Sequence, residues 1–198
     1  MDPYAQTKAA YEKGYIELEA DWVSMGPRMR HIQLAFELSQ SKRPQVLELG
    51  CGPGRDAAVM VPLAKKYVGI DYSPGLIDIA RTKVPLGVFV VGDMVGTPYP
   101  PNSDVIIAFA SVLHLTSQQL KQVLAKAHAS LRPGGVFYIS TKAGTGTISK
   151  ESRYGVRTYY FYDASRIHQL AGPGFTLVHE RVEHIRDQDW TEMALKRL

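Results

Sequence analysis

From residue 46 onward, short apolar runs alternate with segments whose apolar residues recur at helical spacing. Strands that alternate with helices form βαβ units, and these units build a mainly parallel sheet with helices on both faces. The apolar runs cover residues 46–49, 67–70, 88–91, 104–110 and 136–141. The sequence therefore predicts an α/β fold.

Local signals place several helix boundaries. Ser73 before Pro74 is the pattern of an N-cap followed by a first helical position. Thr116 with Gln119 is the pattern of a capping box. Helical periodicity also runs through residues 4–39, where a Gly-Pro pair interrupts it. We therefore expect two or three helices before the first strand.

The C-terminal part of the chain has a looser pattern. Residues 142–157 lack a clear period and predict a long loop, and loops of this length are often functional. A short helix is predicted over residues 163–171, where a Gly-Pro-Gly sequence ends it. Two final strands are predicted near residues 175–180 and 190–196, and these can pair antiparallel.

Composition excludes several classes of protein. With 45% hydrophobic and 21% charged residues, the chain is neither disordered nor fibrous. The formal charge of +4 would suit nucleic acid, but no run of five or six basic residues appears. We therefore expect no nucleic-acid partner.

The cysteine content and the N-terminal sequence bear on the cellular compartment. Cys51 is the lone cysteine, so neither an intrachain disulfide nor a cysteine-based metal cluster is expected. The N-terminus lacks a charged region followed by an apolar stretch, and no segment approaches the roughly 18 consecutive apolar residues of a membrane-spanning helix. We expect a cytoplasmic protein with no membrane partner and no metal.

A glycine-rich turn follows the first predicted strand, with the sequence Gly-Cys-Gly-Pro-Gly at residues 50–54. Glycines let the backbone pass close to a ligand, and the next helix offers free N–H groups at its N-terminus. A dinucleotide-binding turn needs a third glycine where this chain has Arg55. This departure weighs against a nicotinamide cofactor.

Two acidic residues follow the next two predicted strands. Asp71 ends the second strand, about 20 residues after the glycine turn, where a carboxylate can bind ribose hydroxyls. Asp93 follows the third strand in the sequence Gly-Asp-Met. Because the carboxyl ends of parallel strands meet at one edge, all three segments converge. Two carboxylates would repel a pyrophosphate, so the pattern favours S-adenosylmethionine (SAM) over NADP or ATP.

Five segments, in chain order, resemble the motifs of the class I SAM-dependent methyltransferases that act on small molecules. They cover residues 48–54, 69–73, 92–94, 110–114 and 131–135. The resemblance implies a Rossmann-like fold with a seven-stranded, mainly parallel sheet, an antiparallel last strand and helices on both faces. We also expect the N-terminal helices to form a lid. The resemblance also implies methyl transfer from SAM, which leaves S-adenosyl-L-homocysteine (SAH).

We expect the whole chain, residues 1–198, to form a single methyltransferase domain. Residues 1–43 would form the helical cap and residues 44–141 the SAM-binding core. Residues 142–198 would supply the acceptor-side loop and the C-terminal strands. We expect a monomer or a homodimer.

The resemblance further implies which residues contact SAM. The backbone of the glycine turn approaches the methionine part, Asp71 binds the ribose and Tyr72 covers an adenine face. Asp93 accepts from the adenine amino group, and Asp56 receives the methionine ammonium. The full set of implied cofactor contacts is Glu48, Gly50, Cys51, Gly52, Gly54, Asp56, Asp71, Tyr72, Asp93, Met94, Ala110 and Ser111.

Simpler structural explanations exist for some of these residues. The glycine turn could be only a tight connection from strand to helix, and Asp71 with Ser73 could serve only to start a helix. Cys51 is expected to contribute its backbone rather than act as a nucleophile, because nothing in the sequence indicates a low-pKa thiol.

Methyl transfer from a sulfonium is an in-line displacement, so alignment of the acceptor can supply most of the catalysis. An oxygen or protonated nitrogen acceptor must lose a proton, which a histidine can take. His114 follows the fourth predicted strand, where the resemblance places the transferable methyl. It is our candidate for a catalytic base or an acceptor-orienting residue. The alternative is a loop histidine that hydrogen-bonds the backbone.

Aromatic and basic residues on both sides of the core are candidates for contacting the acceptor. Aromatic residues in the N-terminal helices suit a lid that excludes water, although packing explains them equally well. The segment after residue 141 adds cationic and aromatic side chains that suit an acidic or aromatic acceptor. The candidates are Tyr11, Tyr15, His114, Lys142, Tyr154 and Tyr160.

Three interpretations of function remain open at this point. A small-molecule methyltransferase is preferred, because the methyltransferase pattern fills most of the chain. A macromolecular (RNA or protein) methyltransferase and a non-catalytic SAM-binding module are the alternatives, since fold alone does not determine function. The sequence does not indicate whether the acceptor atom is oxygen, nitrogen, sulfur or carbon.

Overall fold

The computed structural model describes residues 2–185 and 187–198. Three helices come first: α1 (Pro3–Lys13), α2 (Tyr15–Ser24) and α3 (Met29–Ser39). The other elements, in chain order, are β1 (Gln45–Leu49), α4 (Ala57–Leu63), β2 (Lys66–Asp71), α5 (Pro74–Lys83), β3 (Val88–Val91), β4 (Ser103–Phe109), the 3₁₀ helix η1 (Val112–His114), α6 (Ser117–Ser130), β5 (Leu131–Lys142), β6 (Thr147–Ser152), β7 (Gly155–Tyr160), α7 (Ala164–Ala171), β8 (Phe175–Ile185) and β9 (Gln188–Arg197).

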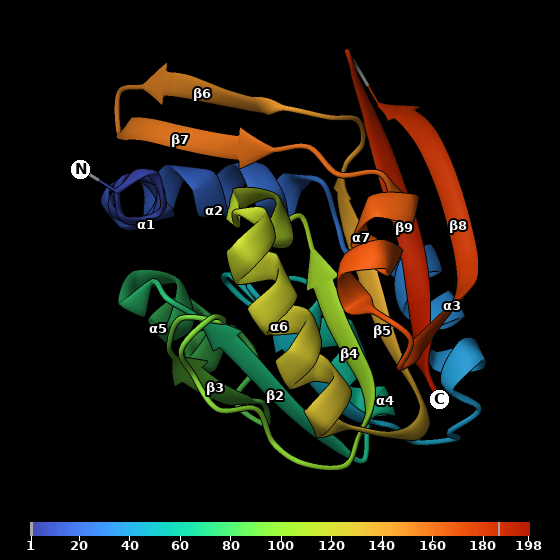
Figure 1. Cartoon of the computed structure of the whole chain (residues 1–198). Helices are drawn as coiled ribbons and strands as arrows, with labels where there is room; N and C mark the ends of the chain where they lie inside the picture. Colours follow the sequence, from blue (N-terminus) through green and yellow to red (C-terminus); the bar gives the residue numbers. More distant parts are fainter. Residues whose placement is uncertain (1, 186) are drawn as a thin grey trace.

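The main sheet has seven strands in the order β3-β2-β1-β4-β5-β9-β8 (Figure 1). The first five strands in this order run parallel to one another, whereas β9 runs antiparallel to both β5 and β8. This arrangement confirms the predicted sheet with its antiparallel last strand. From β1 the chain adds strands first on one side and then on the other. The carboxyl ends of β1 and β4 therefore flank the point where ligands bind in open α/β sheets.

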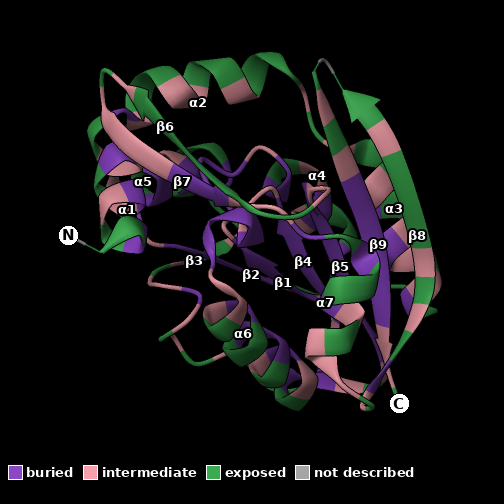
Figure 2. Ribbon diagram, turned by 45° about the horizontal axis from the view of Figure 1, so that its top comes forward, coloured by how far each residue is buried: buried purple, intermediate pink, exposed green. Residues whose placement is uncertain are grey.

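Both faces of the sheet are covered, which explains why its central strands read as continuous apolar runs. In β4, Ile106 and Ala108 belong to the core shared with α6 and α7. Val105 and Ile107 belong to the core shared with α3, α4 and α5. Figure 2 shows these central strands buried between helices whose outer faces are exposed.

The predicted helix signals are confirmed. The Ser73 hydroxyl accepts from the Leu76 N–H at 3.2 Å, at the start of α5. Thr116 and Gln119 form both bonds of a capping box at the start of α6. The predicted short helix is α7, and it ends at Gly172 with a φ of 74°. Three N-terminal helices are present, within the range expected.

The prediction of a loop over residues 142–157 is wrong. Most of this segment lies in an antiparallel hairpin of β6 and β7, which is separate from the main sheet. β6 is exposed and polar, so it lacks the alternation that marks a half-buried strand. The hairpin rests on α1 instead: the Thr158 N–H donates to the Thr7 hydroxyl at 3.0 Å. A contact so remote in sequence could not be read from a local pattern.

Candidate active site

The glycine turn joins β1 to α4 and requires its glycines. Gly50, Gly52 and Gly54 have φ values of 75°, 53° and 79°, a region that other residues rarely adopt. A Cβ on Gly50 would lie 2.5 Å from the Ser111 Cβ. The Ser111 hydroxyl in turn donates to the Leu49 carbonyl at 2.7 Å, which ties the ends of β4 and β1 together.

Asp71 lies at the end of β2, directly against this turn. One carboxylate oxygen accepts from the Gly52 N–H at 2.9 Å and the other from the Ser73 N–H at 3.0 Å. Burial raises the pKa of Asp71 to about 6, although the backbone hydrogen bonds oppose the shift. Asp71 therefore braces the turn, and each of its oxygens keeps a lone pair for a further donor.

Asp93 follows β3 and is covered by helix α1. It accepts from the Tyr4 hydroxyl at 2.9 Å, from the Lys8 ammonium at 2.7 Å and from the Val95 N–H at 2.8 Å. Burial alone would raise the pKa of Asp93, but these hydrogen bonds outweigh it and hold the pKa below its ordinary value. Tyr4 and Lys8 thus fasten α1 over the carboxyl edge of the sheet.

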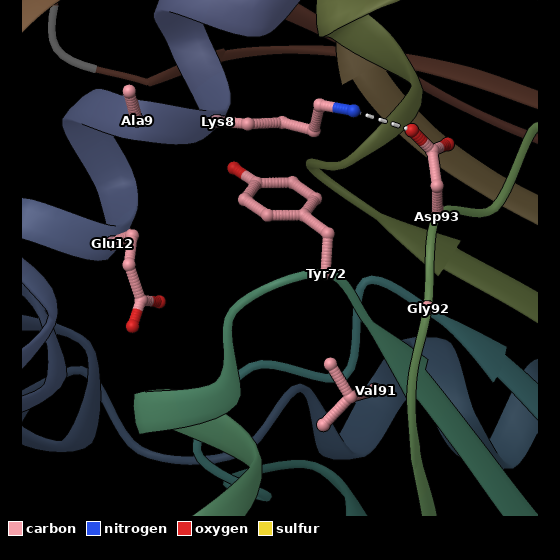
Figure 3. Close-up of a pocket in the computed structure, with 7 residues that line it drawn as sticks. All are labelled: Lys8, Ala9, Glu12, Tyr72, Val91, Gly92 and Asp93. Atoms are coloured by element: carbon pink, nitrogen blue, oxygen red, sulfur yellow. Dashed lines mark hydrogen bonds and ion pairs between the residues drawn. The ribbon is translucent and has the colours of Figure 1, made fainter.

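A cavity of about 400 Å³ lies beside this contact, between α1 and the ends of β2 and β3. Figure 3 shows Tyr72 projecting from the end of β2 toward α1, with the Lys8–Asp93 ion pair on one side. The residues that line the cavity are Lys8, Ala9, Glu12, Tyr72, Val91, Gly92 and Asp93. Tyr72 and Asp93, two of the predicted adenine contacts, thus share one cavity.

Two other predicted cofactor residues lie deeper, on the face covered by α3 and α4. Asp56 accepts from the Arg28 guanidinium at 2.7 Å and from Arg55 at 2.9 Å. Burial raises its pKa to about 6, against the effect of Arg55. Glu48 is buried and accepts from the Tyr67 hydroxyl at 2.5 Å. Ammonium binding by Asp56 and cofactor contact by Glu48 stay predictions.

Cys51, Met94 and Ala110 line the same edge of the sheet. Burial raises the pKa of the Cys51 thiol well above its ordinary value, so it remains protonated and unsuited to act as a nucleophile. The Met94 side chain is buried near Gly50. Ala110 has a φ of 53°, and strained residues of this kind cluster at functional sites.

His114, on η1, is held between α1 and β7. Its Nδ1 lies 2.7 Å from the Thr158 carbonyl oxygen, so Nδ1 must carry the proton that it donates. In the neutral ring Nε2 is then an acceptor, and the Tyr11 hydroxyl donates a hydrogen bond to it at 2.9 Å. Burial lowers the pKa of His114 to about 4. The geometry is that of a neutral histidine that positions Tyr11; proton abstraction by His114 stays a prediction.

Aromatic rings connect the glycine turn to His114 and beyond. The Trp22 ring would meet a Cβ on Gly52 at 3.7 Å, and its centroid lies 5.9 Å from that of Tyr11. The Tyr11 ring lies 5.3 Å from His114, which lies 4.9 Å from Tyr159. The Lys142 ammonium lies 4.2 Å from the Tyr159 centroid. We call Trp22, Tyr11, His114 and Tyr159 the aromatic chain.

Three of the predicted acceptor residues lie away from both the aromatic chain and Lys142. The Tyr15 ring packs against Gly75 at the start of α5, and the Tyr154 ring packs against Gly14. Tyr160 lines a second cavity, of about 650 Å³, between the hairpin and α7. Only Tyr11, His114 and Lys142 of the six candidates are brought together. Whether any of the six contacts an acceptor stays a prediction.

Sequence reasoning missed Lys8, Arg28 and Arg157. The signal for Lys8 was present, since Tyr4, Lys8 and Tyr11 are spaced to share one helix face. Arg28 and Arg157 reach the site through contacts between remote segments, which no local pattern indicates.

Comparison with known proteins shows that residues 46–135 match the family model described as a methyltransferase domain. A Mycolicibacterium smegmatis protein named as an S-adenosylmethionine-dependent methyltransferase is 35% identical over 97 residues, which is 48% of this chain and 37% of that protein. The matched segment, residues 46–135, is a class I SAM-dependent methyltransferase domain. SAM is accordingly its cofactor.

Two further similarities concern proteins with named acceptors. The trans-aconitate 2-methyltransferase of Paracidovorax citrulli is 32% identical over 112 residues, which is 54% of this chain and 42% of that protein. The structure of 1,6-didemethyltoxoflavin-N1-methyltransferase from Burkholderia thailandensis has a TM-score of 0.77, with 20% identity over 98% of this chain and 88% of that chain. This chain spans less than half the length of the M. smegmatis and P. citrulli relatives.

Residues 2–185 and 187–198 lack two kinds of feature. No helix there is both long enough and apolar enough to cross a membrane. No group of three or more His, Cys, Asp or Glu residues in this part of the methyltransferase domain is arranged to hold a metal ion.

Proposed function

We propose that this protein transfers the methyl group of SAM to a small-molecule acceptor. The observation that carries the proposal is the position of α1, whose Tyr4 and Lys8 hold Asp93 at the same carboxyl edge of the sheet where Asp71 braces the glycine turn. The β6–β7 hairpin rests on α1 and extends this cover. A site closed by two segments of its own chain suits a small acceptor, because closure excludes water and holds the reactants in line.

The residues at this edge suit SAM. The Asp71 carboxylate would accept from the ribose hydroxyls, and Tyr72 would lie against the adenine in the cavity beneath α1. The backbone of the glycine turn, where Gly50 and Gly52 carry no side chain of their own, would lie along the methionine part. Ala110 and Ser111, at the end of β4, would lie under the sulfonium. When bound, SAM supplies an electrophilic methyl group.

Helix α1 covers the adenine end of the proposed site. Both Asp93 oxygens already accept from Tyr4 and Lys8, which are the groups that fasten the helix. An adenine amino group can use a remaining lone pair on Asp93 or displace one of these donors. We infer that α1 loosens for SAM to enter and closes again over it.

Orientation by the aromatic chain is the main catalytic contribution in this proposal. Tyr11 is held by His114, and its hydroxyl pKa is raised above the ordinary value by burial. His114 has a pKa of about 4 because of burial, so it is a weak base at neutral pH. The site therefore suits an acceptor that needs little help to lose a proton.

Relatives with named acceptors support the small-molecule interpretation. One is the trans-aconitate 2-methyltransferase described above, and another is the malonyl-[acyl-carrier protein] O-methyltransferase of Serratia marcescens, 31% identical over 99 residues. The didemethyltoxoflavin enzyme shares the fold. The names of these proteins indicate that one methyltransferase fold serves different small acceptors.

Calorimetry tests the proposal at its cofactor step. SAM and SAH, titrated into protein freed of bound ligand, should bind with micromolar affinity, whereas NAD and NADP should not bind. Asp71→Asn should weaken SAM binding roughly 10- to 100-fold, because hydrogen bonds to a charged group contribute about 1.5–3 kcal/mol. Asp78→Asn, a change at an exposed acid on α5, should leave it unaltered. Equal affinity of Asp71→Asn and wild type would contradict the assigned ribose contact.

A further inference from the structure

Three basic residues gather beside the aromatic chain, near Tyr11 and Tyr159. Lys150 and Arg157 are directly opposite each other in the β6–β7 hairpin. The Arg157 guanidinium lies 5.3 Å from the Tyr11 centroid, and the Lys142 ammonium lies 4.2 Å from the Tyr159 centroid. We call Lys142, Lys150 and Arg157 the cationic cluster.

The cationic cluster has no acidic counterpart within residues 2–185 and 187–198. None of its three members takes part in an ion pair there. Burial, with the charges of Lys150 and Arg157, lowers the pKa of Lys142. The Arg157 Nε is buried and finds no hydrogen-bond partner in the described part of the chain.

Other cations near the site are paired. Lys8 binds Asp93, Arg28 and Arg55 bind Asp56, and Arg30 binds Glu192. The cationic cluster differs from these paired cations in two ways that lower stability. Like charges directly opposite each other in a hairpin are destabilising, and a buried donor without a partner costs free energy. Both effects would be offset by a bound anion, so such a cluster is expected where an anion binds.

The cationic cluster also lies next to the proposed methyl-transfer site. His114 follows Ala110 and Ser111 at the end of β4, and its ring contacts both Tyr11 and Tyr159. Those two rings are the ones over which Arg157 and Lys142 lie. Aromatic rings and cations side by side suit a ligand that is both planar and negatively charged.

We propose that Lys142, Lys150 and Arg157 bind the carboxylate of a small planar acid, and that such an acid is the acceptor of this methyltransferase. The proposal rests on the proposed function, because it names the class of acceptor for the same site. A carboxylate offers two oxygens, so one can accept from Arg157 and the other from Lys142. Lys150, which is exposed, adds to the positive potential at the entrance.

Benzoate is a probe for this site, and benzamide is its uncharged counterpart of the same shape. Binding of each to the full chain is measured by two-dimensional NMR titration, with and without SAH. We expect benzoate to bind at least about tenfold more tightly than benzamide, since a charge-assisted contact is worth that much or more. Equal binding of the two compounds, including no detectable binding of either, would overturn the proposal.

Variants assign the preference to the cationic cluster. The double variant Lys142→Gln/Arg157→Gln should lose the preference for benzoate but still bind SAH, which shows that it is folded. The charge-conserving variant Lys142→Arg/Arg157→Lys should retain the preference. Lys121→Gln removes the charge of an exposed lysine on α6 and should behave as wild type. Unchanged benzoate binding in the Gln double variant would also refute the proposal.

The same samples separate this proposal from the proposed function. Calorimetric binding of SAH by wild type tests the cofactor site alone. Binding of SAH together with equal affinity for benzoate and benzamide would leave the methyltransferase function standing and remove the anionic acceptor.

Discussion

His114 makes the stability of this protein depend on pH in a way that can be isolated. Its pKa falls from an ordinary 6.5 to about 4 in the folded protein because it is buried. Between these two values the unfolded chain binds a proton at His114 that the folded chain excludes. The stabilisation is therefore complete above pH 6.5 and is lost as the pH falls toward 4.

The matched variant is His114→Gln. A glutamine amide can donate to the Thr158 carbonyl and accept from the Tyr11 hydroxyl, as the neutral imidazole does, but it does not titrate. From the two pKa values, wild type should lose about 2 kcal/mol of unfolding free energy between pH 7 and pH 4.5 relative to His114→Gln.

Urea unfolding of both proteins at pH 7, 5.5 and 4.5 measures this difference. The unfolding free energy of His114→Gln must be subtracted from that of wild type at each pH, because Asp56 and Asp71 also titrate. Their pKa values are raised to about 6, so their contribution runs the other way: it is present at low pH and is lost as the pH rises through 6. Parallel loss of stability in wild type and His114→Gln, within about 0.5 kcal/mol, would refute the assignment of a buried neutral imidazole.

Three further predictions follow from the same edge of the sheet. Gly50→Ala should lower the melting temperature and abolish SAM binding, because the new Cβ would lie 2.5 Å from the Ser111 Cβ. The control is Gly26→Ala, at a residue with a similar positive φ of 68° and open space around it. This control should lower the free energy of unfolding in urea by only about 1 kcal/mol and keep SAM binding. Lys8→Met should speed SAH dissociation in stopped-flow measurements, because it removes the 2.7 Å ion pair that fastens α1, and an unchanged rate would exclude this helix as a lid. The SAM affinity measured by calorimetry should rise from pH 5 to pH 7, because Asp71, with a pKa of about 6, ionises over this range and becomes a better acceptor for the ribose hydroxyls. If the affinity of wild type were as independent of pH as that of Asp71→Asn, this role of Asp71 would be contradicted.

Much of the core could be predicted because its signals are local. The turn after β1 needs glycine at positive φ, the caps of α5 and α6 use neighbouring residues, and buried parallel strands must be apolar on both faces. These constraints act within a few residues, so they leave a readable pattern. The placement of Asp71 and Asp93 at one edge followed from the rule that parallel strands end together.

What the sequence by itself determined is therefore the sheet, its helices and the common edge at which the glycine turn and two carboxylates meet. Only the tertiary structure decided what those carboxylates and His114 contact. Asp93 is bound by Lys8 from α1 and Asp56 by Arg28. Burial lowers the pKa of His114, which therefore lies uncharged between Tyr11 and the Thr158 carbonyl. Protonation and ion pairing depend on burial and on the distance between remote side chains, and both quantities exist only once the chain has folded.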